Sequence, residues 1–206
     1  MIHDLPELMQ PYVKEKECVL ITEAQASGDL VYRIGDEYIL KVSENIQRLE
    51  RERSVNNYLK GRLPVSETVA FTIEGKKAYY LKTCVKGNPL IGDYLKDPVK
   101  LAKLLARAMR MFHSVDISDC AIINADSRGS TFVHGDFCLP NILAEDGEIT
   151  GFIDTEAAGL GDPWLDIAWC IWSFEYNLGT KEYTDILLEE LGVEFDQEIY
   201  ELYTAL

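Results

Sequence analysis

The segment His134-Gly-Asp-Phe-Cys-Leu-Pro-Asn141, continued by Ile142-Leu-Ala-Glu-Asp-Gly-Glu-Ile-Thr-Gly-Phe-Ile-Asp154, decides how this chain is interpreted. Asp146-Gly147 inside it is a dipeptide typical of a two-residue hairpin turn. Apolar runs at residues 142–144 and 149–153 flank this turn. The pattern predicts that the two runs pair as antiparallel strands.

The two ends of this hairpin would carry oxygen-bearing side chains to one place. Asn141 precedes the first strand, Asp154 follows the second, and Asp136 lies on the loop just before them. Amide and carboxylate oxygens suit Mg²⁺, which takes its remaining ligands from water and phosphate. A third carboxylate beside the metal suits accepting or orienting a substrate hydroxyl. Each residue alone could be a turn former or a cap, but the set at this spacing predicts a phosphoryl-transfer site.

These motifs resemble the catalytic loop and the metal-binding motif of the aminoglycoside phosphotransferases, which are relatives of the protein kinases. The likeness is to the 3′-phosphotransferase branch and spans nearly the whole chain. It is carried by His134-Gly-Asp with Asn141, Phe152-Ile-Asp154, Gly161-Asp-Pro-Trp-Leu-Asp-Ile-Ala168, Arg51-Glu-Arg53, Gly61-Arg-Leu-Pro-Val65 and the segment 112–120.

The resemblance implies roles for the central residues. Asp136 would be the catalytic carboxylate that orients the acceptor hydroxyl, and Asn141 and Asp154 would bind Mg²⁺. Asp166 would hold the catalytic loop by accepting backbone hydrogen bonds, and His134 would brace the same loop.

The resemblance also implies a nucleotide site in the first part of the chain. Lys41, on a predicted strand, resembles the lysine that holds the α- and β-phosphates, and Glu52 resembles its ion-pair partner. A lysine at the centre of a sheet needs a carboxylate or a phosphate nearby to remain charged. Without the family, an exposed lysine at a strand edge would be the simpler interpretation, and Glu50 is a second candidate for the acid.

Two further nucleotide contacts are expected from the resemblance. Ser27, in the turn Ala26-Ser-Gly-Asp29, would meet the β-phosphate, although the same residues could form an ordinary turn. The backbone around Thr83 and Val85 would hydrogen-bond the adenine of ATP, or the base of GTP.

The expected fold class is α+β, a two-lobed protein-kinase-like fold. A small antiparallel β-sheet N-lobe would span residues 1–86, and a mainly helical C-lobe residues 87–206. The patterns predict strands at 18–23, 30–34, 38–42, 69–74 and 77–84, and helices at 44–60, 98–113, 164–177, 181–191 and 196–205. Ser43 is the expected cap of the first helix.

Composition narrows the classes of partner. Thirty-five acidic residues against 20 basic ones give a net charge of −15, which disfavours nucleic acid and favours a cationic acceptor, although it could serve solubility alone. No apolar run is long enough for a membrane span, and the N-terminus does not resemble a secretory signal. We therefore expect a cytoplasmic protein whose five scattered cysteines are reduced thiols. The sequence does not indicate an oligomeric state.

The function implied is an ATP- and Mg²⁺-dependent transfer of the γ-phosphate to the 3′-hydroxyl of an aminoglycoside antibiotic. Only 13 residues separate Cys120 from His134, where enzymes of this family usually carry a longer acidic insertion that lines the antibiotic site. Another acceptor, such as choline, a sugar or a macrolide, therefore stays open as an alternative. A third hypothesis is a nucleotide-binding pseudo-kinase. It is disfavoured because the chain keeps the complete set of catalytic and nucleotide-binding residues: Lys41, Glu52, Asp136, Asn141 and Asp154.

Overall fold

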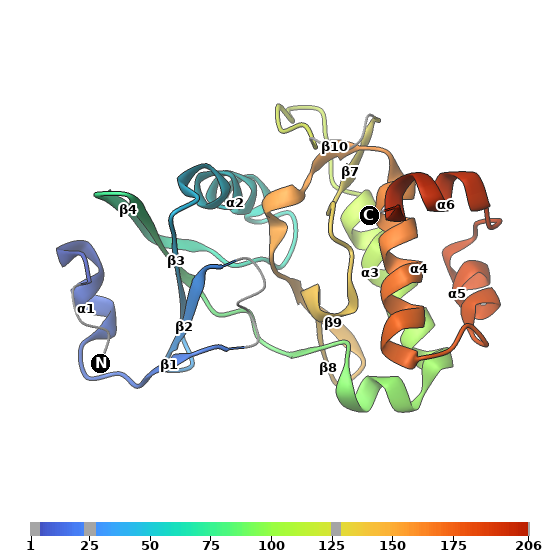
Figure 1. Ribbon diagram of the computed structural model, residues 1–206, viewed down its shortest axis with the longest axis horizontal. Helices are drawn as coiled ribbons and strands as arrows, with labels where there is room; N and C mark the ends of the chain where they lie inside the picture. The colour runs from blue at the N-terminus through green and yellow to red at the C-terminus, as the bar shows by residue number, and fades with distance from the viewer. Residues whose placement is uncertain (1–4, 23–27, 125–128, 206) are drawn as a thin grey trace. The chain divides into compact units, whose positions relative to one another are not determined.

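The computed structural model describes residues 5–22, 28–124 and 129–205. The chain forms two compact units, one of Met1–Lys60 with Val65–Cys84 and one of Gly61–Pro64 with Val85–Leu206. The first contains an antiparallel sheet with one long helix, and the second is mainly helical (Figure 1). This confirms the predicted α+β class. No helix in the described part of the chain is long and apolar enough to cross a membrane.

The sheet of the first unit has the strand order β1-β2-β3-β5-β4, with antiparallel neighbours throughout. Its strands are β1 (Cys18–Leu20), β2 (Leu30–Ile34), β3 (Tyr38–Ser43), β4 (Thr68–Glu74) and β5 (Lys77–Thr83). All five were predicted, with ends that differ by a few residues at most.

Apolar side chains are buried on both faces of this sheet. On one face, Leu40 and Leu81 pack with Met9, which belongs to the short helices η1 (Glu7–Met9) and α1 (Gln10–Val13). On the other face, Ala78 and Tyr80 pack against Leu49 of helix α2 (Ile46–Leu59). Since side chains alternate along a strand, β3 and β5 contribute to both cores. The N-terminal helices were not predicted.

Helix α2 begins later than the sequence indicated. Asn45, not Ser43, is its cap, because the Asn45 side chain accepts a hydrogen bond from the Arg48 N–H. Ser43 still belongs to β3, where it pairs with Ala78, and its hydroxyl accepts from the Asn45 N–H. Two polar residues, separated by one position, could each have capped the helix, and the strand pairing of Ser43 decides between them.

In its described residues, the second unit contains four α-helices and two small sheets. The helices are α3 (Pro98–His113), α4 (Pro163–Leu178), α5 (Thr184–Leu191) and α6 (Gln197–Thr204). One sheet has the order β6-β8-β9, from β6 (Asn88–Pro89), β8 (Ile142–Glu145) and β9 (Glu148–Phe152), and the other pairs β7 (Thr131–Val133) with β10 (Gly159–Gly161). Short 3-10 helices lie at η3 (Gly92–Lys96), η4 (Leu139–Asn141) and η5 (Thr155–Ala157).

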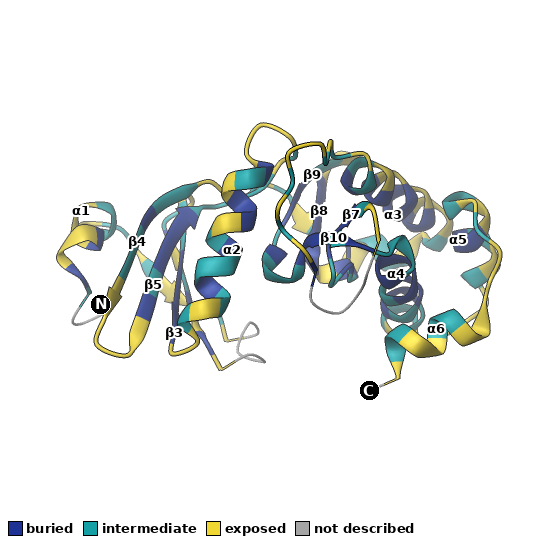
Figure 2. Ribbon diagram, turned by 90° about the horizontal axis from the view of Figure 1, so that it is seen from above, coloured by how far each residue is buried: buried dark blue, intermediate teal, exposed yellow. Residues whose placement is uncertain are grey.

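Helices α3 and α4 contribute many buried residues, which Figure 2 shows in dark blue. Helix α3 has the predicted bounds, and α5 starts at Thr184 instead of residue 181. The segment Gly61–Pro64, expected within the first lobe, is part of the second unit. The Pro64 carbonyl accepts a hydrogen bond from the Phe152 N–H at 3.0 Å, which ties the segment to β9.

Candidate functional site

The hairpin of β8 and β9 forms as predicted. Asp146 and Gly147 both have positive φ, of 51° and 82°, which is the backbone of the tight turn that matches the twist of paired strands. Ile142 lies opposite Phe152 at the open end of the hairpin. The hairpin therefore brings the segments before β8 and after β9 together.

Asn141 and Asp154 stand at those two ends. The Asn141 carbonyl accepts a hydrogen bond of 3.0 Å from the Ile153 N–H, so Asp154 is the next residue along. Asp154 adopts a left-handed backbone conformation, with φ 56° and ψ 51°. Aspartate tolerates this conformation better than most residues because its short side chain can hydrogen-bond locally. The bend turns the chain out of β9 into η5.

Asp136 is held against Asn141. The Asn141 side-chain nitrogen donates to the Asp136 carbonyl at 3.0 Å and to its carboxylate Oδ2 at 2.8 Å. Because the amide nitrogen is used in this way, the amide oxygen Oδ1 is the atom that Asn141 offers to a metal ion. The carboxylate of Asp136 and the amide of Asn141 are thus fixed as one group.

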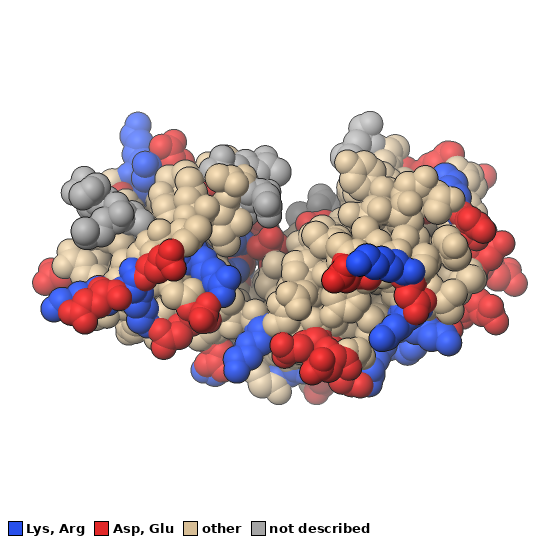
Figure 3. All heavy atoms as spheres, turned by 90° about the horizontal axis from the view of Figure 1, so that it is seen from below, with Lys and Arg blue, Asp and Glu red and all other residues tan. Residues whose placement is uncertain are grey.

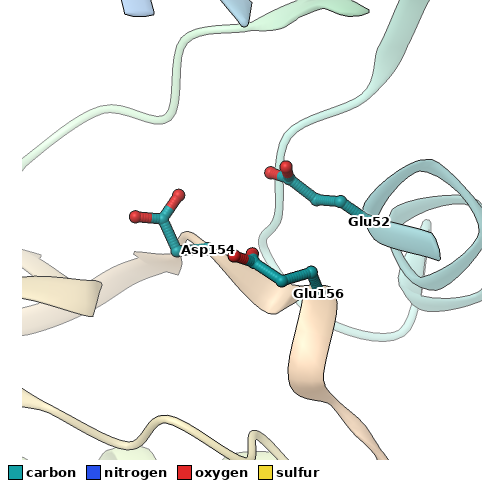
Figure 4. A group of neighbouring side chains, drawn as sticks. All are labelled: Glu52, Asp154 and Glu156. Atoms are coloured by element: carbon teal, nitrogen blue, oxygen red, sulfur yellow. The ribbon is translucent and has the colours of Figure 1, made fainter. Parts of the chain in front are cut away.

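A second carboxylate accompanies Asp154. The carboxylate oxygens of Asp154 and Glu156 lie within 4.8 Å of one another, and Figure 4 shows both on the segment that leaves β9. Glu52, drawn in the same figure, comes from α2 of the first unit. Glu156 was not predicted as a metal ligand. The signal in the sequence is an Asp-x-Glu pattern directly after a strand.

His134 links the loop to the end of β9. Its ring is fully buried, and its Nδ1 accepts a hydrogen bond from the Asp136 N–H at 3.3 Å. Its Nε2 lies 3.0 Å from the Ile153 carbonyl. A carbonyl can only accept, so Nε2 carries the proton and the ring is the neutral tautomer. The predicted bracing role is confirmed, because one imidazole fixes the backbone beside Asp136 and beside Asp154.

Asp166, on α4, holds the start of the same loop. Its carboxylate is fully buried and accepts hydrogen bonds of 2.8 Å from the N–H groups of His134 and Gly135. The ring Nε2 of His113, the last residue of α3, lies 2.9 Å from Asp166 Oδ2. A buried carboxylate needs such partners to offset its lost hydration. The predicted role of Asp166 is confirmed.

Helix α4 also holds the far end of the loop. The Ser173 hydroxyl accepts a hydrogen bond from the Leu139 N–H at 3.0 Å. Ser173 lies two helical turns after Asp166, so both project from one side of α4. Between these anchors Gly135 has φ 81°, and a Cβ there would meet the Ala157 carbonyl at 2.7 Å. The loop packs too closely for any residue but glycine at this position.

Cys138 contributes a thiol next to the Asp136 carboxylate. Burial raises the pKa of this thiol well above its ordinary value, and the negative charge and hydrogen bond of Asp136 raise it further. The thiol therefore stays protonated and donates to Asp136. Cys170, on α4, is fully buried, and burial followed by the charge of Asp166 likewise raises its pKa. All five cysteines are free thiols, as expected, although Cys170 alone is fully buried.

In the first unit, Lys41 and Glu52 form the predicted ion pair. Lys41 Nζ lies 2.9 Å from Glu52 Oε2, and both side chains are buried. The acid is therefore Glu52 and not Glu50. The other oxygen of Glu52, Oε1, is bonded by a second buried lysine, Lys82 of β5. Lys82 was missed, although its alternation with the buried Ala78 and Tyr80 would have placed it on the α2 side of the sheet.

Comparisons with known proteins agree with this geometry. A family model described as "Phosphotransferase enzyme family" matches residues 123–203, which contain the loop, the hairpin and α4. The chain is 26% identical to an aminoglycoside 3′-phosphotransferase of Enterococcus faecalis, over 98% of this chain and 96% of the relative. It is 27% identical to one of Staphylococcus aureus, with the same shares covered. The chain is thus similar to aminoglycoside 3′-phosphotransferases over nearly its whole length.

Solved structures show the same fold. The crystal structure of an aminoglycoside 3′-phosphotransferase of type VIII superposes with a TM-score of 0.79 at 20% identity, over 96% of this chain and 97% of that one. The phosphotransferase APH(3″)-Id from Streptomyces rimosus, in complex with ADP and streptomycin, gives 0.76 at 18% identity, over 95% and 93%. The two-lobed kinase-like architecture expected from the sequence is therefore confirmed.

The aminoglycoside 3′-phosphotransferases are longer than this chain. The alignments with the Enterococcus and Staphylococcus enzymes occupy 254 positions, against 206 residues here. The relatives therefore carry residues that this chain lacks. This agrees with the short stretch noted between Cys120 and His134.

The remaining predicted nucleotide contacts of an aminoglycoside phosphotransferase stay predictions. Ser27 lies outside the described residues. Thr83 is the last residue of β5, where its N–H and hydroxyl both pair with Glu67, at 2.9 and 2.8 Å. Val85 follows after one residue and is the first of the second unit's main segment.

Proposed function

We propose that this chain is an ATP- and Mg²⁺-dependent phosphotransferase that moves the γ-phosphate to the 3′-hydroxyl of an aminoglycoside. The observation that carries the proposal is the Asp136 carboxylate, held 2.8 Å from the Asn141 amide at the hairpin end that also carries Asp154. Relatives named as aminoglycoside 3′-phosphotransferases over nearly the full chain support the acceptor. Such a reaction would take place in the cytoplasm, where ATP is supplied.

Asp136 would take the proton in this reaction. The acceptor oxygen forms its bond to the γ-phosphorus while the bond from that phosphorus to the ADP oxygen breaks, and the hydroxyl proton passes to the Asp136 carboxylate. The hydrogen bond from Asn141 keeps the carboxylate in one orientation, and positioning is most of what phosphoryl transfer needs from a protein. ADP leaves with the electrons of the broken bond.

Asn141 and Asp154 would hold Mg²⁺. Their amide and carboxylate oxygens are hard donors of the kind that this ion prefers, and Glu156 adds a carboxylate beside Asp154. When bound, the metal would neutralise charge on the phosphates. In the first unit, Lys41 would pair with the α- and β-phosphates while Glu52 holds its ammonium group in place.

The charge of the chain fits a cationic acceptor. The net charge is −15, and the space-filling view in Figure 3 shows acidic side chains gathered at the end of the second unit. The segment around α5 and α6 supplies many acids: Glu182, Asp185, Glu189, Glu190, Glu194, Asp196, Glu198 and Glu201. An aminoglycoside carries several ammonium groups, which such a field would attract.

Measuring ADP release with a panel of acceptors tests the proposal. The informative pair is an aminoglycoside with a 3′-hydroxyl and its analogue that lacks only this group. Release of ADP with the first alone supports the proposed activity. Turnover with choline, a sugar or a macrolide instead would show that the acceptor is not an aminoglycoside. Nucleotide binding without any turnover would favour the pseudo-kinase.

The metal site has a separate test. Asp154→Asn keeps a residue that tolerates the left-handed backbone but removes the charge that attracts the cation. We expect nucleotide affinity measured by calorimetry to depend on Mg²⁺ in the unsubstituted protein and to lose most of that dependence in Asp154→Asn. An unchanged Mg²⁺ dependence would remove Asp154 from the metal site.

A further inference from the structure

Lys82 is a buried lysine that the functions proposed so far do not use. Its side chain is 3% exposed, and its ammonium group is bonded to Glu52 Oε1. Lys41 bonds the other oxygen of the same carboxylate, Oε2, at 2.9 Å. Lysine is rarely buried in proteins unless it is paired, and here two lysines share one acid.

The sheet register fixes the two lysines side by side. Lys41 of β3 is opposite Tyr80 of β5, and Lys82 is opposite Ile39. Residues two apart on a strand face the same side, so Lys41 and Lys82 are diagonal neighbours on the side covered by α2. Glu52 reaches both from α2, and the ring of Tyr80 lies 5.9 Å from the Lys82 ammonium.

The charge balance of this group separates the roles of the two lysines. An ion pair formed by Lys41 and Glu52 without Lys82 would be neutral. A neutral ion pair attracts a phosphate less than an ammonium group alone does. Because Lys82 is bonded to Oε1, it offsets part of the negative charge of Glu52 that Lys41 would otherwise face. Lys41 then keeps Glu52 as a positioning partner while its own positive charge acts on a ligand.

We propose that Lys82 is a positioning residue of the nucleotide site, which offsets the charge of Glu52 so that Lys41 presents more of its own charge to the phosphates of a nucleoside di- or triphosphate. This inference depends on the proposed function in one respect, namely that the ligand is a nucleotide. Lys82 need not touch the phosphates. It acts through Glu52.

Calorimetry with MgATP, and with inorganic tripolyphosphate as a base-free probe, tests this role. Lys82→Met keeps the length of the side chain and removes its charge, and we expect about tenfold weaker binding of both probes. Lys77→Met is the matched control, because it removes the same charge from the exposed start of the same strand. It should bind as the unsubstituted protein does, and Lys82→Arg should rescue most of the loss.

A double substitution separates this role from simple structural support. In Glu52→Gln/Lys82→Met the charges of both Glu52 and Lys82 are gone and Glu52 no longer offsets the charge of Lys41, so we expect affinity to return to within about threefold of the original value. If Lys82→Met only lowers the melting temperature and binds both probes normally below it, the inference is wrong. The same holds if the double variant binds no better than Lys82→Met.

The outcomes also distinguish this inference from the proposed function. If the unsubstituted protein binds neither MgATP nor tripolyphosphate, the nucleotide site itself is refuted and the role of Lys82 falls with it. If it binds both and Lys82→Met binds equally well, the role of Lys82 alone is refuted.

Discussion

The loop from His134 to Asn141 and the lysine pair of the first unit are held in different ways. Asp166 and Ser173 hold the loop mainly by its backbone N–H groups, so its shape does not depend on most of its side chains. In the lysine pair, side chains from β3, β5 and α2 bond directly to one another. We therefore expect substitution of Asp136 in the loop to change chemistry without unfolding it. Substitutions among Lys41, Glu52 and Lys82 should change charge and packing together.

Asp136 provides the strongest test of a loop that is held by its backbone. Asp136→Asn should lower kcat by about a thousandfold, because general-base catalysis typically contributes two to four powers of ten. Stability and nucleotide affinity should change little, since the loop anchors are elsewhere. The control is Asp146→Asn, in the exposed turn between β8 and β9, which should leave kcat unchanged. Retention of kcat in Asp136→Asn would remove Asp136 from the reaction.

Asp166 tests the anchors themselves. Asp166→Ala removes the acceptor of two backbone N–H groups and the partner of His113, and we expect it to cost about 4 kcal/mol of unfolding free energy. Asp166→Asn keeps one acceptor oxygen and should cost less. Denaturant unfolding measures both, with the exposed Asp185→Asn as control. A loss below about 1 kcal/mol in Asp166→Ala would mean that the loop is held by other contacts.

The contrast between the loop and the lysine pair also explains which parts of the site could be predicted from the sequence. The hairpin and its three functional residues occupy one short segment, where a turn dipeptide and strand alternation suffice to place Asn141 next to Asp154. The pairing of Lys41 with Glu52 came from the family resemblance alone. Nothing local to Lys82 indicates that it shares Glu52, because the contact spans 30 residues and depends on the register of β3 with β5.

Cys138 of the loop and Cys170 of α4 give a pH-dependent test. Burial raises the pKa of Cys138 and Cys170 in the folded protein, whereas the unfolded chain ionises near the ordinary value of 9.0. Below that value both states keep the protons and stability is unaffected. Above it the folded state holds more protons, so stability falls by about 1.4 kcal/mol per pH unit for each thiol.

The unfolding free energy should be measured between pH 9 and 10. Burial also raises the pKa of Tyr80 above its ordinary value of 10.0, so above pH 10 this tyrosine would lower stability in the same way. Cys138→Ser keeps a donor for Asp136 and should remove about half of the slope that the two thiols contribute. Cys138→Ser/Cys170→Ala should remove the rest. A slope that is unchanged in the double variant would show that these thiols do not cause it.

The smallest expected change in stability concerns the start of α2, the helix that carries Glu52 of the lysine pair. Asn45→Ala removes the cap that bonds the Arg48 N–H and should cost about 1 kcal/mol of unfolding free energy. Ser43→Ala should cost less, because the backbone of Ser43 remains paired in β3 and only its bond to the Asn45 N–H is lost. The opposite ranking would mean that α2 starts at the position predicted from the sequence. Since α2 carries Glu52, fraying of its first turns should also weaken nucleotide binding in Asn45→Ala, whereas substitutions at the loop anchors should lower kcat instead.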